Sequence, residues 1–358
     1  MSFNLDKLLR DVFAPQPGER VLVMFDVPHG KIHGDQDWTD RIGMAKEWHA
    51  GFKQLGCDVL PLLAYPATGA SNADLPAAGD TDGNQASVPD MIARANIVVA
   101  LTRYSATAPL SAHVKSRPDL RVASMPNVLR RMEQSALAAD YSVVGPRTHA
   151  LAERLTRADA ADVVFSSGHK FTFDLRYRTG HADDGMCGPD KQGFRLINLP
   201  SGEAFIVPYE GERPGEPSLT HGVIPLSRNG ESMLLHVEKN RIVKVEGAGP
   251  QCTLFRSFLD TDPARNNVAE LGLGCNDKAI VTGNVLEDEK AGYHWAYGRS
   301  EHLGGVTGPD AFKSPANVVH HDVVYAPGSP IGILSLTLRY PDGSSERIMD
   351  HSKYCIFS

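Results

Sequence analysis

Apolar runs alternate with helical patterns through the first 145 residues, and this alternation constrains the fold more than any other feature. The runs RVLVMFDVP, CDVLPLLAY and NIVVALT predict strands. Between them, WTDRIGMAKEWHAGFKQLG and VPDMIARA carry apolar residues spaced by three and four, which predicts amphipathic helices. Continuous apolar strands separated by helices are typical of a parallel sheet covered on both faces. The sequence therefore predicts an α/β, Rossmann-like N-terminal domain over residues 1–150.

The loop after the first strand argues against a bound dinucleotide. Its sequence, DVPHGKIHG, contains neither a GxGxxG motif nor a phosphate loop. We therefore expect no nucleotide cofactor. The stretch from Pro66 to Gln85 is dense in Gly, Ala, Asp and Asn, which predicts a loop.

The pattern changes to short strands and turns from about Asp162. The stretches KFTFDLRY, GEAFIVPYEG and SMLLHVEKNRIVKVEG predict strands, and Lys239-Asn240 in the last of them predicts a hairpin turn. This pattern favours antiparallel sheet. We predict an α+β C-terminal domain over residues 151–358, and the acids and histidines described below predict that it binds metal.

Charge, hydropathy and cysteine use exclude several classes of protein. The 358 residues include 36 Lys+Arg and 43 Asp+Glu, a net charge of −7, with no basic run, so we expect no nucleic-acid partner. We find no signal peptide and no apolar stretch long enough to span a bilayer, so we expect a cytoplasmic protein without a membrane partner. Five scattered cysteines without a CxxC pair predict neither disulfides nor a thiolate zinc site.

Acids and histidines recur in apolar or glycine-rich stretches of the second half. These stretches are NVAELGLGCN with Glu270, VLEDEKAGYHWAYG with Glu289 and His294, SEHLGG with Glu301 and His302, and VVHHDVV with His320 and Asp322. Carboxylate and imidazole ligands suit zinc, manganese, cobalt or ferrous iron. Two carboxylates able to bridge can hold two cations about 3.5–4 Å apart. The stretches together predict a metal centre.

The spacing within VVHHDVV supports a metal site on a strand. Alternate residues of a strand face opposite sides, so His320 and Asp322 share one face and His321 lies on the other. An ionised Asp322 among valines is costly unless it is paired or bound to metal. Glu289 and His294 are five residues apart with a glycine between them, so we expect them to converge from a loop.

Each of these residues, taken alone, also has a purely structural interpretation. Glu289 could begin an exposed acidic helix, His294 could be a packed core histidine, and Glu270 could be an acid in the first turn of a helix. Their joint occurrence in one half of the chain favours the metal centre.

Four motifs, in this order, resemble the thermophilic aminopeptidase family of metallopeptidases. The matching stretches are NLPSGEAFIVP, AELGLGCNDKA, TGNVLEDEKAGYHWAYG and VVHHDVV. The resemblance implies a homodimer whose subunits have two domains, with two metal ions in the second domain. It also implies a ligand set carried over onto Glu270, Glu289, His294, His320 and Asp322.

Two departures from the family pattern concern the substrate. Where the family usually has a tyrosine near the metals, this chain has Glu301 followed by His302. The stretch GHKFTFDLRY replaces a smaller turn and introduces His169 and Lys170. Both changes affect substrate recognition more directly than metal binding.

We therefore expect a dinuclear metal-dependent hydrolase that cleaves an amide or peptide bond in a peptide or small molecule. Its cofactors would be two zinc, cobalt or manganese ions, which polarise the carbonyl and activate a water molecule. Glu289 or Glu301 would transfer the proton to the leaving nitrogen, and His302 would stabilise the oxyanion.

Two alternative functions are consistent with the same residues. A related branch contains ring-cleaving dioxygenases of heteroaromatic catabolism, which hold one Fe(II) ion and have a histidine where this chain has Glu270. The glutamate favours the hydrolase, because a second carboxylate helps to hold a second cation. A metal-stabilised binding protein without catalysis is the other alternative.

Overall fold

The computed structural model describes residues 3–357 and shows a mixed α/β fold with parallel and antiparallel sheets. The chain divides into two compact units. The first consists of Met1–Pro146, Asp183–Gly202 and Asn276–Lys290, and the second of Arg147–Ala182, Glu203–Cys275 and Ala291–Ser358. The predicted domain limits, 1–150 and 151–358, stay a prediction.

The first unit contains an eight-stranded sheet with the order β11-β7-β6-β1-β3-β4-β5, and β2 pairs with β1. Its strands are β1 (Arg20–Val27), β2 (Asp58–Val59), β3 (Leu63–Pro66), β4 (Ala78–Thr81), β5 (Asn84–Ser87), β6 (Ile97–Thr102), β7 (Arg121–Pro126) and β11 (Leu196–Asn198). Parallel pairings join six of these strands to one another, as the alternation of strands and helices predicts: β1, β2, β3, β6, β7 and β11.

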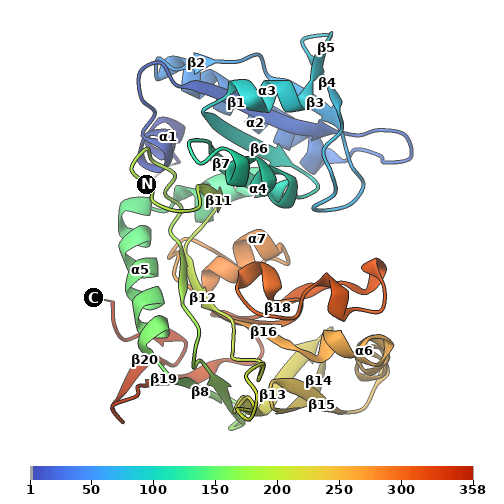
Figure 1. The fold of residues 1–358 in the computed structure, drawn as a ribbon, viewed down its shortest axis with the longest axis vertical. Helices are drawn as coiled ribbons and strands as arrows, with labels where there is room; N and C mark the ends of the chain where they lie inside the picture. Colours follow the sequence, from blue (N-terminus) through green and yellow to red (C-terminus); the bar gives the residue numbers. More distant parts are fainter. Residues whose placement is uncertain (1–2, 358) are drawn as a thin grey trace. The chain divides into compact units, whose positions relative to one another are not determined.

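Helices cover both faces of this sheet (Figure 1). They are α1 (Leu5–Phe13), α2 (Gln36–Gln54), α3 (Val88–Arg94) and α4 (Thr107–Ser116). Val23 of β1 shares a core with Trp48 of α2. The next residue, Met24, faces the opposite side and shares a core with Ile92 of α3. A strand buried on both sides explains why RVLVMFDV is continuously apolar.

The predicted loop from Pro66 to Gln85 is partly wrong, because it contains a hairpin. β4 and β5 pair antiparallel across the turn residues Asp82 and Gly83. Both turn residues have a positive φ, 53° and 86°, which is the geometry that a tight two-residue hairpin turn requires. Low apolar content concealed these strands.

The second unit contains an eight-stranded antiparallel sheet with the order β15-β14-β13-β9-β8-β19-β20-β21. The strands are β8 (Ala160–Phe165), β9 (Lys170–Asp174), β13 (His221–Arg228), β14 (Glu231–Glu238), β15 (Arg241–Glu246), β19 (Ile333–Arg339), β20 (Ser345–Asp350) and β21 (Lys353–Tyr354). The predicted hairpin turn at Lys239-Asn240 is confirmed, with positive φ at both residues.

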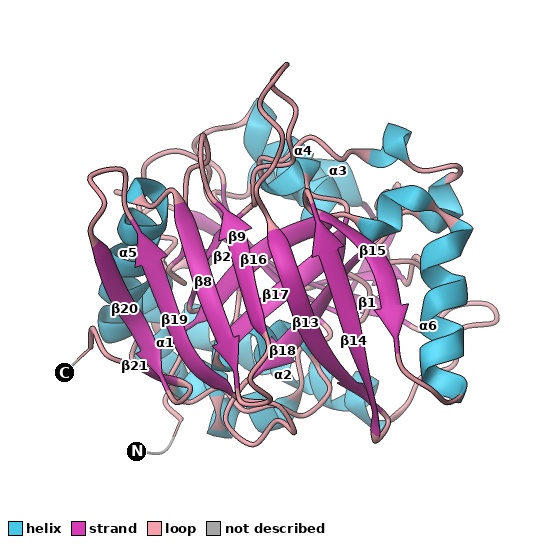
Figure 2. Ribbon diagram, turned by 90° about the horizontal axis from the view of Figure 1, so that it is seen from below, coloured by secondary structure: helices cyan, strands magenta, loops and turns pink. Residues whose placement is uncertain are grey.

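A five-stranded sheet packs against the eight-stranded one and carries the candidate site. Its order is β10-β12-β16-β17-β18. The strands are β10 (His181–Asp183), β12 (Glu203–Ile206), β16 (Val268–Gly274), β17 (Tyr293–Gly298) and β18 (His320–Tyr325). Leu271 and Trp295 share a core with Phe165 and Leu336 of the larger sheet, and Figure 2 shows the larger sheet in front of these strands. The residues that adjoin Leu271 and Trp295 along their strands therefore point to the other face of the sheet, away from this core.

The other α-helices of residues 3–357 are α5 (Tyr141–Arg157), α6 (Pro250–Thr261) and α7 (Val285–Asp288), and short 3-10 helices lie between the elements. Among residues 3–357, no helix has the length and apolar character needed to cross a bilayer.

Candidate metal centre

The five-stranded sheet brings acids and histidines together on the face that is turned away from the shared core. Across the strands, the register pairs Glu203 with Gly274, Glu270 with Ala296, His294 with Gly272, Asp322 with Ala296, and His320 with Gly298. Each polar residue thus lies beside a glycine or an alanine. These small neighbours leave room for the polar side chains to converge over the sheet.

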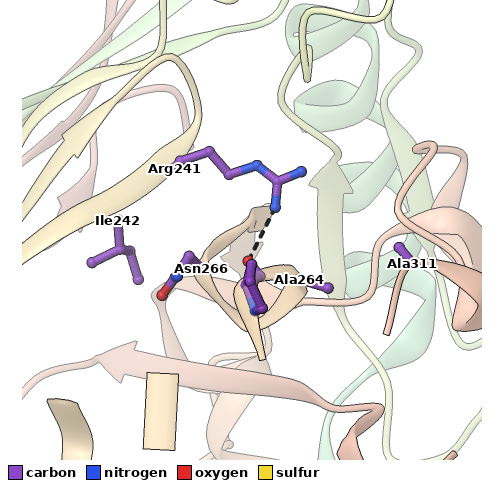
Figure 3. Close-up of a pocket in the computed structure, with 6 residues that line it drawn as sticks. Arg241, Ile242, Ala264, Asn266 and Ala311 are labelled. Atoms are coloured by element: carbon purple, nitrogen blue, oxygen red, sulfur yellow. Dashed lines mark hydrogen bonds between the residues drawn. The ribbon is translucent and has the colours of Figure 1, made fainter. Parts of the chain in front are cut away.

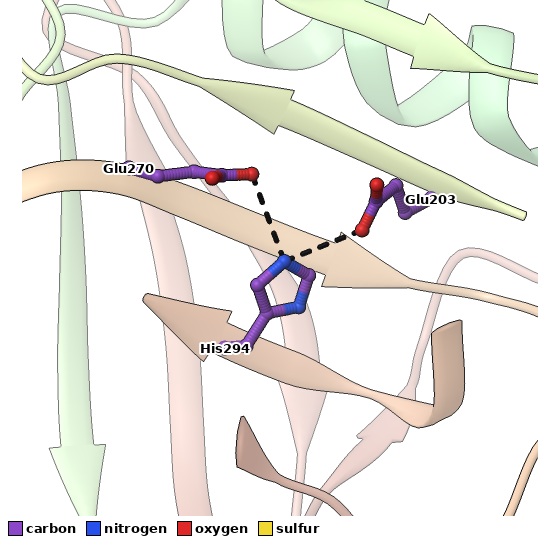
Figure 4. Close-up of side chains that lie close together, drawn as sticks. All are labelled: Glu203, Glu270 and His294. Carbon is purple, nitrogen blue, oxygen red and sulfur yellow. Dashed lines mark ion pairs between the residues drawn. The ribbon is translucent and has the colours of Figure 1, made fainter. Parts of the chain in front are cut away.

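Glu203, Glu270 and His294 form the first cluster, and all three are buried (Figure 4). His294 Nε2 lies 3.3 Å from Glu203 Oε2 and 3.7 Å from Glu270 Oε1. Within residues 3–357, no hydrogen bond of good geometry reaches His294 Nε2. A buried nitrogen aimed at two carboxylates in this way is typical of a metal ligand.

Glu270, His320 and Asp322 form the second cluster. His320 Nε2 lies 3.0 Å from Glu270 Oε2 and 3.6 Å from Asp322 Oδ1. In each cluster the ligand atoms lie within 4.8 Å of one another, which is compatible with a shared ion.

Glu270 belongs to both clusters and divides its two oxygens between them. Oε1 faces His294, whereas Oε2 faces His320. A carboxylate that offers one oxygen to each of two adjacent ligand sets has the arrangement of a bridging ligand between two cations.

Backbone carbonyls orient both imidazoles. Nδ1 of His320 donates to the carbonyl oxygen of Arg299 at 2.7 Å, and Nδ1 of His294 donates to that of Gly292 at 3.2 Å. Because Nδ1 carries the proton in these bonds, Nε2 of each ring points toward the carboxylates. Such outer hydrogen bonds commonly fix the orientation of histidine ligands.

The charges of the cluster shift the pKa values of its members. Burial alone would raise the pKa of Glu270, but His294 and His320 outweigh it and lower that pKa to about 2. Burial alone would lower the pKa values of both histidines, but the carboxylates around them raise both well above the usual range. The carboxylates therefore stabilise positive charge on this face, which is the electrostatic requirement for a cation site.

The donor set fits divalent metal ions. It comprises three carboxylates and two imidazoles, and such oxygen and nitrogen ligands suit zinc, cobalt and manganese. Burying several carboxylates together is costly without compensating positive charge, which two divalent ions would supply.

His321 lies on the opposite face of β18, as the strand period predicts. Its Nδ1 lies 3.2 Å from the hydroxyl of Tyr297, and its ring stacks on Phe258 with the centroids 5.8 Å apart. His320 and His321 are thus sequence neighbours with different surroundings.

The short helix η5 (Glu301–Leu303) places His302 beside the second cluster. The His302 ring meets the His320 ring edge to face, with the centroids 4.9 Å apart. Partial burial and the charges of His320 and Arg299 lower the pKa of His302. Glu301 accepts a hydrogen bond from Arg299 at 2.7 Å. The sequence-predicted residue His302 therefore lies next to the second cluster, whereas the Glu301 side chain is exposed and pairs with Arg299.

The buried carboxylate of Glu210 anchors the loop that carries His302. It accepts hydrogen bonds from Ser300 Oγ at 3.0 Å, Thr307 Oγ1 at 2.6 Å and the backbone N–H of Val306 at 2.6 Å. It also accepts one from the amide of Asn267 at 2.8 Å. One side chain thus fixes both ends of the loop.

Another hollow of the second unit, of about 370 Å³, has different chemistry (Figure 3). Its lining includes Arg241, which donates a hydrogen bond to the carbonyl oxygen of Pro263 at 3.3 Å, together with Ile242 and Asn266. Among the described residues that line it there is no acid or histidine, so it does not compete with the five-stranded sheet as a metal centre.

Comparison with known proteins identifies the family. The sequence model of the thermophilic metalloproteases (M29) matches residues 127–312, more than half of the chain. The chain belongs to this metalloprotease family. Membership supports a metal-dependent peptidase function and the use of divalent metal ions. A comparison with curated proteins gives no match.

Two solved structures share the fold of this metalloprotease. The 2,5-dihydroxypyridine dioxygenase from Pseudomonas putida KT2440 is 17% identical with a TM-score of 0.65, over 98% of this chain and 97% of that one. Wild-type AmpT from Thermus thermophilus is 15% identical with a TM-score of 0.58, over 98% of each chain. At these identities the likeness shows the fold alone.

Glu203 is the cluster residue that sequence reasoning missed. It begins β12 within the stretch NLPSGEAFIVP, whose acid at the start of an apolar strand was the available signal.

Glu289 was predicted from the sequence as a metal ligand. It lies at the start of η4 (Glu289–Ala291) in the first unit, where it accepts a hydrogen bond from Lys290 at 2.7 Å. Its role as a metal ligand stays a prediction.

We predict that Gly272→Ala displaces the first cluster. A Cβ atom at this position would lie 1.9 Å from His294 Nε2, so the ring would have to leave the carboxylates. We expect the affinity for zinc to fall by at least about tenfold, as for other losses of ligand orientation. A competition titration with a chelating dye measures it. Gly188→Ala is the control, because a Cβ there meets nothing within 4 Å; equal affinities in both variants would contradict the prediction.

We predict that Glu210→Gln destabilises the second unit. An amide nitrogen would replace an oxygen that accepts buried hydrogen bonds, at a cost of about 1–3 kcal/mol in the free energy of unfolding. Urea denaturation measures this cost. Glu212→Gln is the matched control, because Glu212 pairs with Arg178 nearer the surface and should change stability by less than about 1 kcal/mol. A loss in Glu210→Gln no larger than in the control would count against an anchoring role.

Proposed function

We propose that this chain is a dinuclear metal-dependent hydrolase that cleaves an amide or peptide bond. The observation that carries the proposal is the division of the Glu270 oxygens between two imidazoles. Membership of the thermophilic metalloprotease family supports it.

The proposed ligands form two sets that share Glu270. Glu203 and His294 complete one set, and His320 and Asp322 complete the other. Glu203 joins the sequence-predicted ligands because it is buried and its Oε2 lies 3.3 Å from His294 Nε2. Zinc, cobalt and manganese are the metals that this mixture of carboxylates and imidazoles suits.

Two divalent ions in this position would supply Lewis acidity to a substrate carbonyl and lower the pKa of a water molecule. The chain's own residues have the remaining tasks. Backbone carbonyls keep His294 and His320 in a fixed orientation. Because its ring lies 4.9 Å from that of His320, His302 is proposed to donate an N–H to the developing oxyanion.

A carboxylate is proposed to move the proton from water to the leaving nitrogen. Glu301 is one candidate: it lies two residues after Arg299, whose carbonyl oxygen accepts from His320 Nδ1, and it pairs with the Arg299 side chain. Glu289 remains the other candidate from the sequence. A homodimer is also part of the proposal, on the resemblance alone, and a cytoplasmic location is proposed from the sequence.

The alternative is a mononuclear non-haem iron dioxygenase that opens an aromatic or heteroaromatic ring. Its support is the small ligand set of His320, Asp322 and Glu270, which could hold one Fe(II) ion and leave coordination positions open. The fold is shared with a 2,5-dihydroxypyridine dioxygenase. The hydrolase is favoured because the adjacent set with Glu203 and His294 would then have no purpose.

We predict that metal content depends on Glu270 in a specific way. The wild-type protein, saturated with zinc and desalted, should hold close to two ions per chain. Glu270→Ala should lose both ions, because each set loses an oxygen. His320→Ala should lose the second ion, whereas the control His321→Ala should keep both. Plasma mass spectrometry counts the ions, and a wild-type content of one ion would contradict the dinuclear centre.

We predict that the zinc- or cobalt-loaded protein hydrolyses aminoacyl anilides or small amides. Release of the chromophoric amine measures the rate, which should fall to the background in His320→Ala and persist in His321→Ala. The opposite result is oxygen uptake by the iron-loaded protein with a dihydroxylated heteroaromatic substrate and no amide cleavage. That outcome would replace the hydrolase with the dioxygenase.

A further inference from the structure

A stacked aromatic pair stands on the same sheet as the metal centre. The rings of Phe205 on β12 and His181 on β10 are nearly parallel, with the centroids 5.3 Å apart and an interplanar angle of 27°. Phe205 is partly exposed and His181 is exposed. The pair is therefore not sealed within the core, and part of Phe205 is accessible.

The strand register places Phe205 beside the first cluster. Phe205 follows Glu203 by two positions, so both side chains lie on the same face of β12. Phe205 is paired with Gly272 of β16, and Gly272 is paired in turn with His294 of β17. The imidazole of His294 occupies the space above Gly272, because a Cβ there would lie 1.9 Å from its Nε2. The Phe205 ring therefore borders the space around His294 Nε2.

The order of the strands also determines which side of Phe205 is turned toward the metals. His181 lies on β10, to one side of β12, whereas Glu270 and His294 lie on β16 and β17, to the other side. His181 thus supports the ring from behind. The side toward β16 faces Gly272 and the His294 imidazole that lies over it.

The loop after β17 borders the same region. His302 packs against the His320 ring on β18. Two residues later, a Cβ at Gly304 would lie 3.8 Å from His181 Nε2. Since β10 and β18 are the two edges of the five-stranded sheet, this loop passes from one edge of the metal-bearing face to the other. It bounds the space between the clusters and the aromatic pair.

We propose that Phe205, supported by His181, forms one wall of a substrate subsite that takes a flat aromatic or heteroaromatic ring beside the metal centre. The substrate class is then an amide whose reacting carbonyl is adjacent to, or carried by, such a ring. Stacking on Phe205 orients the ring, and His181 supports Phe205 from the opposite side. This inference rests on the proposed metal centre.

The chain offers a matched control for this pair. Phe258 and His321 also form a stacked phenylalanine and histidine pair, with the centroids 5.8 Å apart and an interplanar angle of 13°. His321 belongs to the opposite face of β18, with its Nδ1 near the Tyr297 hydroxyl. Substitution of Phe258 should therefore disturb packing without changing ring recognition at the metals.

The test measures the binding of two hydroxamates to the zinc-loaded protein by calorimetry. Benzohydroxamate and cyclohexanecarbohydroxamate share the metal-binding group and the size of the ring, but only the first is flat. The wild-type protein should bind benzohydroxamate about three- to tenfold more tightly, as expected for aromatic stacking. Phe205→Leu should abolish this preference at unchanged zinc content, Phe205→Tyr should retain it, and Phe258→Leu should leave it at the wild-type value.

The outcomes separate this inference from the proposed function. A preference that persists in Phe205→Leu overturns the subsite, whatever the protein hydrolyses. If the preference depends on Phe205 but no amide is cleaved, the subsite stands and the hydrolase fails. If the wild-type protein binds zinc but neither hydroxamate, both the accessible metal centre and the subsite are contradicted.

Discussion

The carboxylate of Glu270 lies buried between two imidazoles, and the other features of the site depend on this position. Its two oxygens face His294 and His320 separately. A buried negative charge is stable only when positive charge surrounds it, and here the imidazoles come from two neighbouring strands whose backbone carbonyls hold their rings. Glycine and alanine at the paired positions leave the space that these rings need. The proposed metal centre is therefore a property of one sheet face rather than of a flexible loop.

Much of this arrangement could be predicted from local patterns. Continuous apolar runs between helical patterns indicated the parallel sheet of the first unit, because a strand buried on both faces has no polar alternation. The strand period separated His320 and Asp322 from His321, which the structure places against Phe258 on the opposite face. The turn at Lys239-Asn240 was visible because asparagine tolerates the positive φ that the hairpin requires.

The rest depends on pairing between distant segments, which local patterns do not encode. Glu203 reaches His294 only because β12 pairs antiparallel with β16 in one particular register. The chain also returns twice to the first unit, through Asp183–Gly202 and Asn276–Lys290. Glu289 lies within the second of these returns. The hairpin of β4 and β5 was hidden for a different reason, since its strands contain few apolar residues.

The most direct test of the dinuclear account is the anomalous diffraction of crystals grown with zinc, measured at the zinc absorption edge. The account predicts two anomalous peaks about 3.5–4 Å apart, one beside each oxygen of Glu270, with Glu203 and His294 at the first and His320 and Asp322 at the second. A single peak held by His320, Asp322 and Glu270, with Glu203 and His294 making no contact to metal, would contradict the dinuclear centre.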